Sequence, residues 1–378
     1  MENRLKKVYF PNLNGVRFLA AFVVIIHHIE QFKELLGYKN NWANPVIKNI
    51  GPLGVILFFV LSGFLITYLL LVEEKQTKTI SIKSFYMRRI LRIWPLYYFI
   101  IFISFFFFSQ IPFFNLGTWT DLIHNQFLVK VLFFVLFLPN AALMIFSPIP
   151  YASQTWSVGV EEQFYLIWPI LMKNVRNKKR LLYFIIFFYL FIKIPLFYFF
   201  ENYIYWNSYL VIFKNIFNTF SIDCMAIGGM FAIFLFEKNR ILKIIYSKYI
   251  QIFTLFVLTV FIIKGITVPY VNYEFYALLF GILIVNLAAN KKSILNLENN
   301  VLHYLGKISY GLYMYHPIAI MITLKALYSI NISNIYIQIL MSVSLTVFIA
   351  GVSYKYFESY FIKKKNIFTK IVSGEEAI

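Results

Sequence analysis

The sequence predicts an all-α fold, a polytopic helical bundle integral to a membrane. Only 13% of its 378 residues are charged and 60% are hydrophobic, whereas soluble domains carry about 25% charged residues. The apolar residues are gathered in runs of roughly twenty, the length that crosses the hydrocarbon core of a bilayer as a helix. Short polar connections separate these runs, so we expect no additional soluble domain.

Ten segments are predicted to cross the membrane as helices. They are residues 13–33, 52–72, 88–110, 156–172, 181–200, 213–236, 249–265, 272–289, 301–323 and 334–356. Lysine and arginine are concentrated in alternate connections, and basic connections usually face the cytoplasm. With both termini in the cytoplasm, only eight of the 35 basic residues face outward, namely Lys33, Lys39, Lys48, Lys130, Lys193, Lys214, Lys264 and Lys325. The charge pattern therefore predicts cytoplasmic termini.

One further apolar stretch, residues 126–146, does not fit this alternation. If it crossed the membrane, the basic run 173–180 would lie outside. Pro139 and Asn140 interrupt it, and irregular backbone at membrane depth is tolerated where it lines a cavity. We therefore expect a re-entrant or interfacial hairpin. No internal repeat is visible, so the inverted-repeat signature of many transporters is missing.

The same pattern gives the domain organisation. We expect a membrane domain at residues 1–360 and a short basic cytoplasmic tail at 361–378. The first apolar run lacks an A-x-A cleavage site, which predicts a retained helix and not a removed signal peptide. The single cysteine, Cys224, leaves no partner for a disulfide within this sequence. The net charge of +19 is spread over the connections, which argues against a nucleic acid partner.

The first predicted helix carries two ionisable residues on one face. Arg17 and His28 are eleven residues apart, about three turns, so they lie roughly 16 Å apart along the axis. Ionisable groups are costly in a bilayer and usually mark a ligand path or a catalytic site. Arg17 also fits a snorkelling anchor, and His28 also fits a polar bond to a neighbouring helix. His27 points about 100° away and is the weaker candidate.

The third predicted helix begins with a basic run at residues 88–92. Arg89 and Arg92 share a face, and guanidinium forks suit phosphates. Basic residues at a cytoplasmic helix end also follow from topology alone. Beside a helix that carries Arg17, the pair indicates a multiply phosphorylated cytosolic ligand.

Two further segments hold candidate catalytic residues. Glu161 and Glu162 stand near the start of an apolar helix, where the helix dipole favours carboxylates. They fit first-turn capping, or a carboxylate that orients a histidine. His316 precedes Pro317 in the ninth predicted helix, at a depth comparable with that of His28. A buried polar contact between helices is the alternative for this histidine.

Other polar residues in apolar segments carry less information. Asp223 is an intramembrane carboxylate to which the sequence assigns no role. Ser62 is a candidate for lining a path, in a helix whose small residues allow close packing. The five histidines lie on separate segments apart from the adjacent His27 and His28, so no metal site is predicted.

Taken in order, these segments resemble the membrane acyltransferase-3 family over nearly the whole chain. The matching segments are Asn14-Gly15-Val16-Arg17 with His27-His28, residues 57–65, residues 88–92, Trp156-Ser157 with residues 161–165, and residues 309–317. Two positions depart from the family pattern. Asn14 stands where many members have aspartate, and Ile56 stands where many have a polar or acidic residue.

The resemblance implies a ten-helix membrane-bound O-acyltransferase of the inner (plasma) membrane. Such enzymes take an acyl group, often acetyl, from cytosolic acyl-CoA and place it on a hydroxyl of a surface polysaccharide, lipopolysaccharide or another extracytoplasmic acceptor. The expected partners are acyl-CoA, a glycan or lipid-linked glycan and membrane lipid, without a permanently bound cofactor. Some relatives carry an extra C-terminal hydrolase-like domain. We expect the membrane domain of this chain to act alone or with a separate partner.

Two residue patterns of the family can be matched in this sequence. Arg17 and His28 match an arginine–ten residues–histidine pattern, and Arg89 and Arg92 match an arginine pair on the third helix. The three arginines are expected to bind the nucleotide phosphates of acyl-CoA. The pantetheine arm is about as long as the separation of Arg17 and His28, so the acyl group would cross by reach.

The expected chemistry centres on His28, which would deprotonate the acceptor hydroxyl or accept the acyl group itself. Glu161 or Glu162 would support it, and His316 would bind or orient the acceptor. The main alternative is a secondary transporter or flippase for a lipid-linked sugar or ion, because intramembrane ionisable residues also serve proton relays. A structural partner of a glycan assembly complex is a third possibility.

Overall fold

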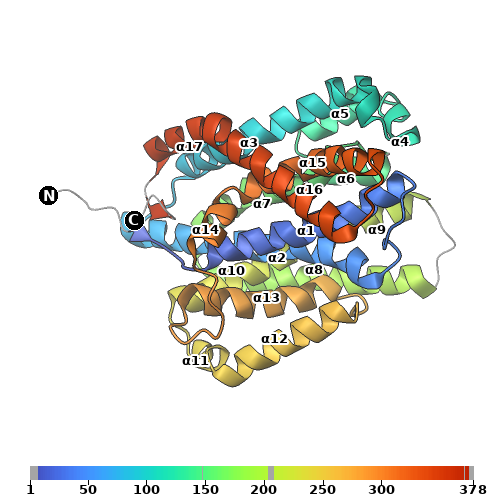
Figure 1. Cartoon of the computed structure of the whole chain (residues 1–378). Coiled ribbons are helices and arrows are strands. Elements are labelled where there is room, and N and C mark those ends of the chain that lie inside the picture. Colours follow the sequence, from blue (N-terminus) through green and yellow to red (C-terminus); the bar gives the residue numbers. More distant parts are fainter. Residues whose placement is uncertain (1–6, 147, 203–207, 370, 374–378) are drawn as a thin grey trace.

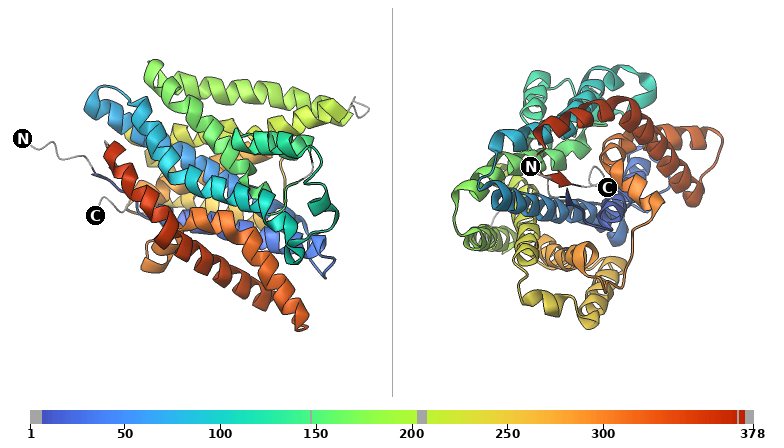
Figure 2. Two further views of the ribbon diagram at one scale, coloured as in Figure 1. Left: turned by 90° about the horizontal axis from the view of Figure 1, so that it is seen from above. Right: turned by 90° about the vertical axis from the view of Figure 1, so that its left-hand side faces the viewer.

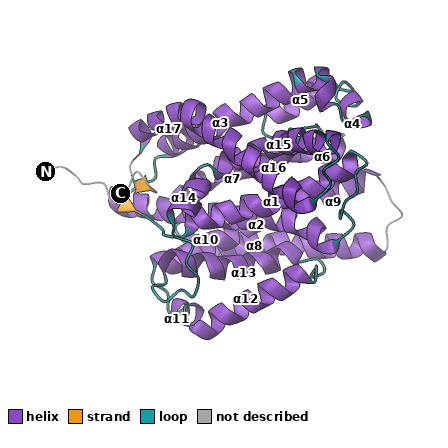
Figure 3. Ribbon diagram, in the orientation of Figure 1, coloured by secondary structure: helices purple, strands orange, loops and turns teal. Residues whose placement is uncertain are grey.

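The computed structural model describes residues 7–146, 148–202, 208–369 and 371–373, and their regular structure is helical apart from one pair of two-residue strands. Figure 1 shows the helices packed side by side, and Figure 3 shows how little of the chain lies outside them. The long helices are α1 Leu13–Leu35, α2 Pro45–Thr77, α3 Ile82–Phe106, α7 Trp156–Asn174, α8 Lys178–Asn202, α10 Ile222–Phe236, α12 Lys248–Ile263, α13 Asn272–Ala289, α15 Ser309–Ser329 and α16 Ile335–Ser353.

Shorter elements connect and extend these helices. The short α-helices are α4 Thr118–Asp121, α5 Phe127–Val135, α6 Pro139–Ile145, α9 Ser208–Phe220, α11 Ile241–Ile245, α14 Asn300–Lys307 and α17 Ser359–Lys365. Single 3-10 turns lie at Phe108–Gln110, Pro112–Phe114, Ser153–Thr155 and Asn366–Phe368, and a π-helical turn lies at Tyr354–Glu358. The strands are β1 Lys7–Val8 and β2 Val372–Ser373.

Each of the ten predicted spans coincides with helix. In the described part of the chain, seven helical stretches are long and apolar enough to cross a membrane, which confirms a helical membrane protein. They are Leu13–Leu35, Pro45–Thr77, Ile82–Gln110, Lys178–Glu201, Tyr209–Phe236, Asn272–Ala289 and Ile335–Phe368. Helix α12, which has 16 residues, and helix α7, which carries Glu161 and Glu162, are not among these seven stretches. The number of crossings and the side on which the termini lie remain predictions.

The structure changes the outline of several predicted spans. The segment 213–236 is broken at Ser221, whose φ of 32° separates α9 from α10. The segment 301–323 is broken at Ile308, between α14 and α15. Helix α2 begins earlier than expected, because Asn44 accepts a hydrogen bond from the amide of Val46 and Pro45 provides a favourable first helical residue.

The segment 126–146 forms two short helices, α5 and α6, instead of one continuous span. They have 9 and 7 residues, or roughly 13 and 10 Å, against a hydrocarbon core of about 30 Å. Phe137, with φ 58°, turns the chain between them. Its carbonyl oxygen and Asn140 Oδ1 both accept from Gln163 Nε2, at 2.7 and 2.9 Å. Gln163 thus satisfies polar atoms of the turn between the two helices. A re-entrant or interfacial position of this pair remains a prediction.

Helix α2 packs against α10 at very close range, and both lie in the interior of the bundle (Figure 1). A Cβ atom at Gly63 would overlap the carbonyl oxygen of Met225, and one at Gly228 would overlap that of Val60. Backbone therefore meets backbone at this crossing, the use of small residues expected between membrane helices. The contact fixes α2, which forms one wall of the site described below.

The two ends of the described chain meet at one end of the bundle. Strands β1 and β2 pair in parallel, with Lys7 opposite Val372 and Val8 opposite Ser373. Figure 2 shows this pair near the middle of the face where the N- and C-terminal segments emerge. The expected tail from residue 361 begins within α17, and residues 370 and 374–378 of that tail lie outside the described residues. The division at residue 360 remains a prediction.

Candidate active site

A cavity of about 240 Å³ lies between α1, α2, α3, α7 and α15. At one end it is lined by both terminal segments, through Val8–Phe10 and through Lys365, Thr369 and Ile371. Ser157 and Tyr313 line it further inside the bundle. The cavity therefore opens where the strand pair lies and extends into the membrane domain.

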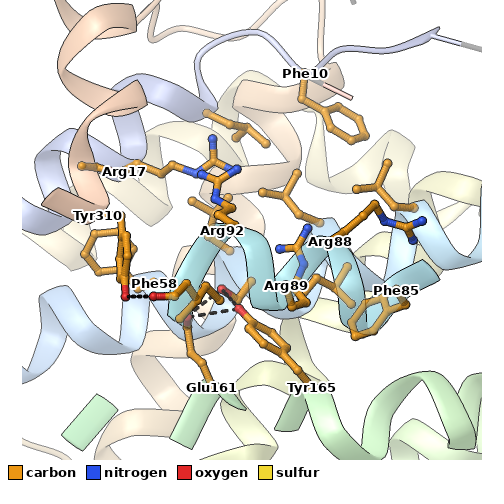
Figure 4. Close-up of a pocket in the computed structure, with 18 of the residues that line it drawn as sticks. Phe10, Arg17, Phe58, Phe85, Arg88, Arg89, Arg92, Glu161, Tyr165 and Tyr310 are labelled. Carbon is orange, nitrogen blue, oxygen red and sulfur yellow. Dashed lines mark hydrogen bonds between the residues drawn. The ribbon is translucent and has the colours of Figure 1, made fainter. Parts of the chain in front are cut away.

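Arginines dominate one wall of this cavity (Figure 4). Arg17 comes from α1, and Arg88, Arg89 and Arg92 come from the first turns of α3, all of them half-buried. Arg88 forms an ion pair with Glu73 at 3.2 Å and donates to the carbonyl oxygen of Phe368 at 2.8 Å. The sequence analysis did not single out Arg88, although it belongs to the same basic run.

The other three arginines have no carboxylate at ion-pair distance within the described residues. Arg17 donates to Asn14 Oδ1 at 2.8 Å. Arg89 lies 5.9 Å from the centre of the Tyr165 ring, and its buried Nε atom has no hydrogen-bond partner. The structure thus brings the three predicted arginines together on one cavity wall, with guanidinium groups that no carboxylate of the described residues pairs.

Only one of the two predicted glutamates faces the cavity. Glu161 lines it and accepts hydrogen bonds from Ser62 Oγ at 2.7 Å and from the Tyr165 hydroxyl at 3.1 Å (Figure 4). Glu162, about 100° further around α7, accepts from Trp94 Nε1 at 2.8 Å and does not line the cavity. Tyr165 was missed in the sequence, where its spacing of four residues from Glu161 could have revealed it.

The two predicted histidines, His28 and His316, lie in contact. His316 Nε2 is 3.2 Å from His28 Nδ1, and the ring centres are 4.8 Å apart. In the described structure Glu161 bonds to Ser62, Glu162 bonds to Trp94, and the side chain in contact with His28 is His316. Support of His28 by a glutamate remains a prediction, for which these residues show no direct contact. His27 points to the first turn of α2, where its Nδ1 lies 2.7 Å from the Ile47 carbonyl oxygen.

Tyr313 connects the cavity with the histidine pair. Its hydroxyl hydrogen-bonds with Ser157 Oγ at 2.6 Å, and both residues line the cavity. Its backbone carbonyl oxygen lies 2.7 Å from His316 Nδ1, one helical turn further along α15. The ring of Phe58 packs edge-on against Tyr313 at 5.9 Å. The arginines and the histidines therefore belong to one contiguous region of the bundle.

Asp223 lies in a different part of the molecule, among α8, α10 and α13. Its neighbours are Lys193 and Glu274, which form a buried ion pair at 2.6 Å. Neither oxygen of the Asp223 carboxyl group has a hydrogen-bond donor in the described structure. This cluster is separate from the cavity, and no residue of it lines the arginine wall.

Comparison with models of protein families assigns the chain to a family. The model of the acyltransferase domain family matches residues 10–354. The chain belongs to the acyltransferase-3 family. The match spans α1, α2, α3, α7 and α15 of the cavity wall and confirms the resemblance seen in the sequence. Together with its apolar helices, this membership makes the chain a multi-pass protein of the plasma membrane.

Curated relatives share the family and differ in length. The chain is 27% identical over 406 residues to the peptidoglycan O-acetyltransferase OatA of Listeria monocytogenes, covering 98% of this chain and 58% of the relative. It is 27% identical over 400 residues to a candidate O-acetyltransferase of Staphylococcus aureus strain COL, covering 95% and 58%. It is 33% identical over 165 residues to the candidate peptidoglycan O-acetyltransferase YrhL of Bacillus subtilis, covering 43% and 24%.

The chain thus spans about three-fifths of the length of the first two relatives. No solved structure matches it.

Proposed function

We propose that this protein is a membrane-bound O-acyltransferase that moves an acetyl group from cytosolic acetyl-CoA to a sugar hydroxyl of a cell-wall polymer outside the membrane. Family membership supports the reaction class. The name of the Listeria relative, a peptidoglycan O-acetyltransferase, supports a glycan acceptor. The observation that carries the choice of donor is the wall of Arg17, Arg89 and Arg92, which has no carboxylate at ion-pair distance among the described residues.

The argument for an anionic donor rests on charge. Removing an unpaired guanidinium from water costs several kcal/mol unless an opposite charge compensates it. Two acidic residues line the cavity: Glu73 is paired with Arg88, and Glu161 faces the other three arginines at longer range. The cavity therefore keeps an excess of positive charge. A diphosphate or a phosphorylated ribose matches planar guanidinium forks in charge and in geometry.

The topology that accompanies this function has ten crossings and both termini in the cytoplasm. The cavity opens beside the paired terminal strands. With those strands on the cytoplasmic side, the arginine wall is reached from the cytosol, where acyl-CoA is found. Residues 1–360 then form the membrane domain, and residues 361–378 form a basic tail on the same side as the donor.

His28 is the residue that handles protons in this scheme. It lies about 16 Å along α1 from Arg17, which an extended pantetheine arm can span. His28 takes the proton of the acceptor hydroxyl while the oxygen attacks the thioester carbonyl. The carbon–sulfur bond then breaks, and the thiolate of CoA takes the proton from the imidazolium. Transfer of the acyl group to His28 itself, followed by attack of the hydroxyl, uses the same atoms in two steps.

Glu161 has a proposed place in the donor half of the site. It holds Ser62 and Tyr165 by hydrogen bonds at the cavity wall and faces the arginines. Glu162 anchors α7 to α3 through Trp94. Glu161 stays a candidate through the shape and charge of the cavity, Glu162 through its support of α7, and neither acts on His28 by direct contact.

A thiol-release assay on the purified full chain in lipid nanodiscs tests the proposal. With acetyl-CoA and a soluble glycan acceptor, wild-type protein should release CoA thiol and form an acetyl ester in equal amounts. His28→Ala should abolish both products and still bind CoA. Thiol release without ester would indicate hydrolysis, and ester formation from a donor other than acyl-CoA would refute the choice of donor. A transporter would produce neither product.

A further inference from the structure

The contacts of His28 and His316 show which nitrogen of each neutral ring carries the hydrogen. His316 is fully buried, with 0% of its surface exposed, and its Nδ1 lies 2.7 Å from the carbonyl oxygen of Tyr313. A carbonyl oxygen can only accept, so Nδ1 of His316 carries a hydrogen. In a neutral imidazole the other nitrogen, Nε2, then holds a lone pair and accepts.

The same argument continues to His28. Its Nδ1 lies 3.2 Å from the acceptor Nε2 of His316 and 2.9 Å from the carbonyl oxygen of Val24. Both neighbours accept, so Nδ1 of His28 carries the hydrogen and shares it between them. Two independent contacts therefore assign the same tautomer. The lone pair of His28 is left on Nε2, which makes no hydrogen bond within the described part of the chain.

The side chains of His28 and His316 differ in solvent exposure, and this difference separates their roles. Both nitrogens of His316 are occupied and its side chain is buried, so it has no atom with which to reach a substrate. His28 is half-buried and keeps accessible surface. Of the two rings, His28 alone combines a free lone pair with access.

We propose that His316 is the positioning residue for His28, and that Nε2 of His28 is the atom that receives the acceptor proton. This inference rests on the proposed function and replaces the expected role of His316 in binding the acceptor. The geometry repeats the logic of a base whose far nitrogen donates to an orienting group. Here the orienting group is a neutral imidazole in place of a carboxylate.

One proton moves during acyl transfer, and it moves by way of His28. The hydroxyl proton of the acceptor moves to Nε2 of His28, and the imidazolium that forms keeps its hydrogen on Nδ1. That hydrogen bond to Nε2 of His316 becomes charge-assisted and holds the ring in place. Nε2 then gives its proton to the leaving thiolate. His316 gains and loses no proton, so its contribution is orientation and stabilisation of the transient charge.

Two substitutions at His316 separate this role from a purely structural one. The amide oxygen of glutamine reaches roughly the place of Nε2, whereas that of asparagine reaches roughly the place of Nδ1. His316→Gln should retain turnover within about tenfold of wild type, and His316→Asn should lose about 100-fold, the scale of lost second-shell partners. The KM for acetyl-CoA should stay unchanged in both variants, because the arginine wall is intact.

The control measurements keep this test distinct from that of the proposed function. Wild-type protein that transfers no acyl group refutes the proposed function. Active wild type and inactive His28→Ala, combined with a near-normal rate for His316→Asn, overturns the role of His316 alone. Nitrogen-15 NMR of the labelled wild-type protein gives a second reading that needs no variant to fold. It should show neutral His28 protonated at Nδ1, and protonation at Nε2 would contradict the assignment.

Discussion

At the scale of single residues, the site divides into a charged half and a nearly neutral half. The charged half holds arginines whose only carboxylate ion pair in the described structure is that of Arg88 with Glu73. The other half holds two histidines without a carboxylate partner. This division fits a bisubstrate reaction in which one substrate is recognised by charge and the other is activated by a base.

The arginine wall gives the first prediction. Arg89→Ala should weaken CoA binding by about 10- to 100-fold, because a hydrogen bond to a charged group contributes about 1.5–3 kcal/mol. Arg88→Ala is the matched control, because the guanidinium group of Arg88 is already paired with the Glu73 carboxylate. It should change the dissociation constant of CoA by much less. Isothermal titration of CoA measures both, and equal losses would contradict the assignment of Arg89.

The adjacent glutamates give a second contrast. Glu161→Gln should lower turnover at saturating donor without weakening CoA binding, because it removes a negative charge from the cavity and disturbs Ser62 and Tyr165. Glu162→Gln should leave the rate within about threefold of wild type, since the amide oxygen still accepts from Trp94. Steady-state kinetics distinguish the two variants. A larger effect of the Glu162 substitution would contradict this account, because Glu162 does not line the cavity.

At the scale of helices, the crossing of α2 and α10 depends on two glycines that meet carbonyl oxygens. Gly228→Ala should destabilise the protein by about 1–3 kcal/mol, the cost of overpacking a close contact. Gly229→Ala is the matched control one residue on, where the nearest atoms are side-chain ends, the closest being Thr67 Oγ1 at 2.9 Å. Thermal unfolding in detergent should show a clear drop in Tm only for Gly228→Ala, and equal drops would contradict the packing argument.

The buried cluster of α8, α10 and α13 makes a separate prediction about stability. Asp223 is fully buried beside the carboxyl group of Glu274, and its oxygens have no hydrogen-bond donor among the described residues, so burial favours the neutral acid. Asp223→Asn should therefore cost less than about 1 kcal/mol. Glu274→Gln leaves Lys193 without its partner and should cost about 3 kcal/mol or more. Thermal unfolding compares them, and a reversed order would show that Asp223 is charged.

The sequence predicted the helices well and their mutual contacts poorly. Apolar runs of membrane length reveal a helix from composition alone, so each of the ten segments falls on helix, while seven described stretches are long and apolar enough to cross a membrane. The break at Ser221 depends on a backbone angle, and its local signs are only a serine at the start of α10 and Asp223 in the first turn. His28 and His316 are 288 residues apart, and spacing along the chain cannot show that they touch. Two adjacent carboxylates likewise give no sign of which one faces the cavity.

At the scale of the whole molecule, the paired ends of the chain and the opening of the cavity lie together. One topology therefore decides three things: the side of both termini, the side of donor entry and the side from which His28 is reached. If the termini are cytoplasmic, the donor enters from the cytosol and the acceptor approaches from outside. This links the direction of acyl transfer across the membrane to the charge pattern of the connections.

Cysteine labelling tests this topology. In a Cys224→Ser background, Lys39→Cys lies in the exposed connection between α1 and α2, and Gln76→Cys lies in the exposed last turn of α2. A membrane-impermeant maleimide should label Lys39→Cys in intact cells and Gln76→Cys only after permeabilisation. The opposite pattern would place the arginine wall on the outer side and exclude a cytosolic donor.

The most direct test of the central claim is the content of base-labile acetyl ester in the cell wall of the host. Mass spectrometry would compare wild type, a deletion strain, and the deletion strain complemented with wild-type or His28→Ala protein at equal expression. The account predicts that deletion removes the ester, that wild-type protein restores it, and that His28→Ala does not. Full restoration by His28→Ala, or an ester content unchanged by deletion, would contradict it.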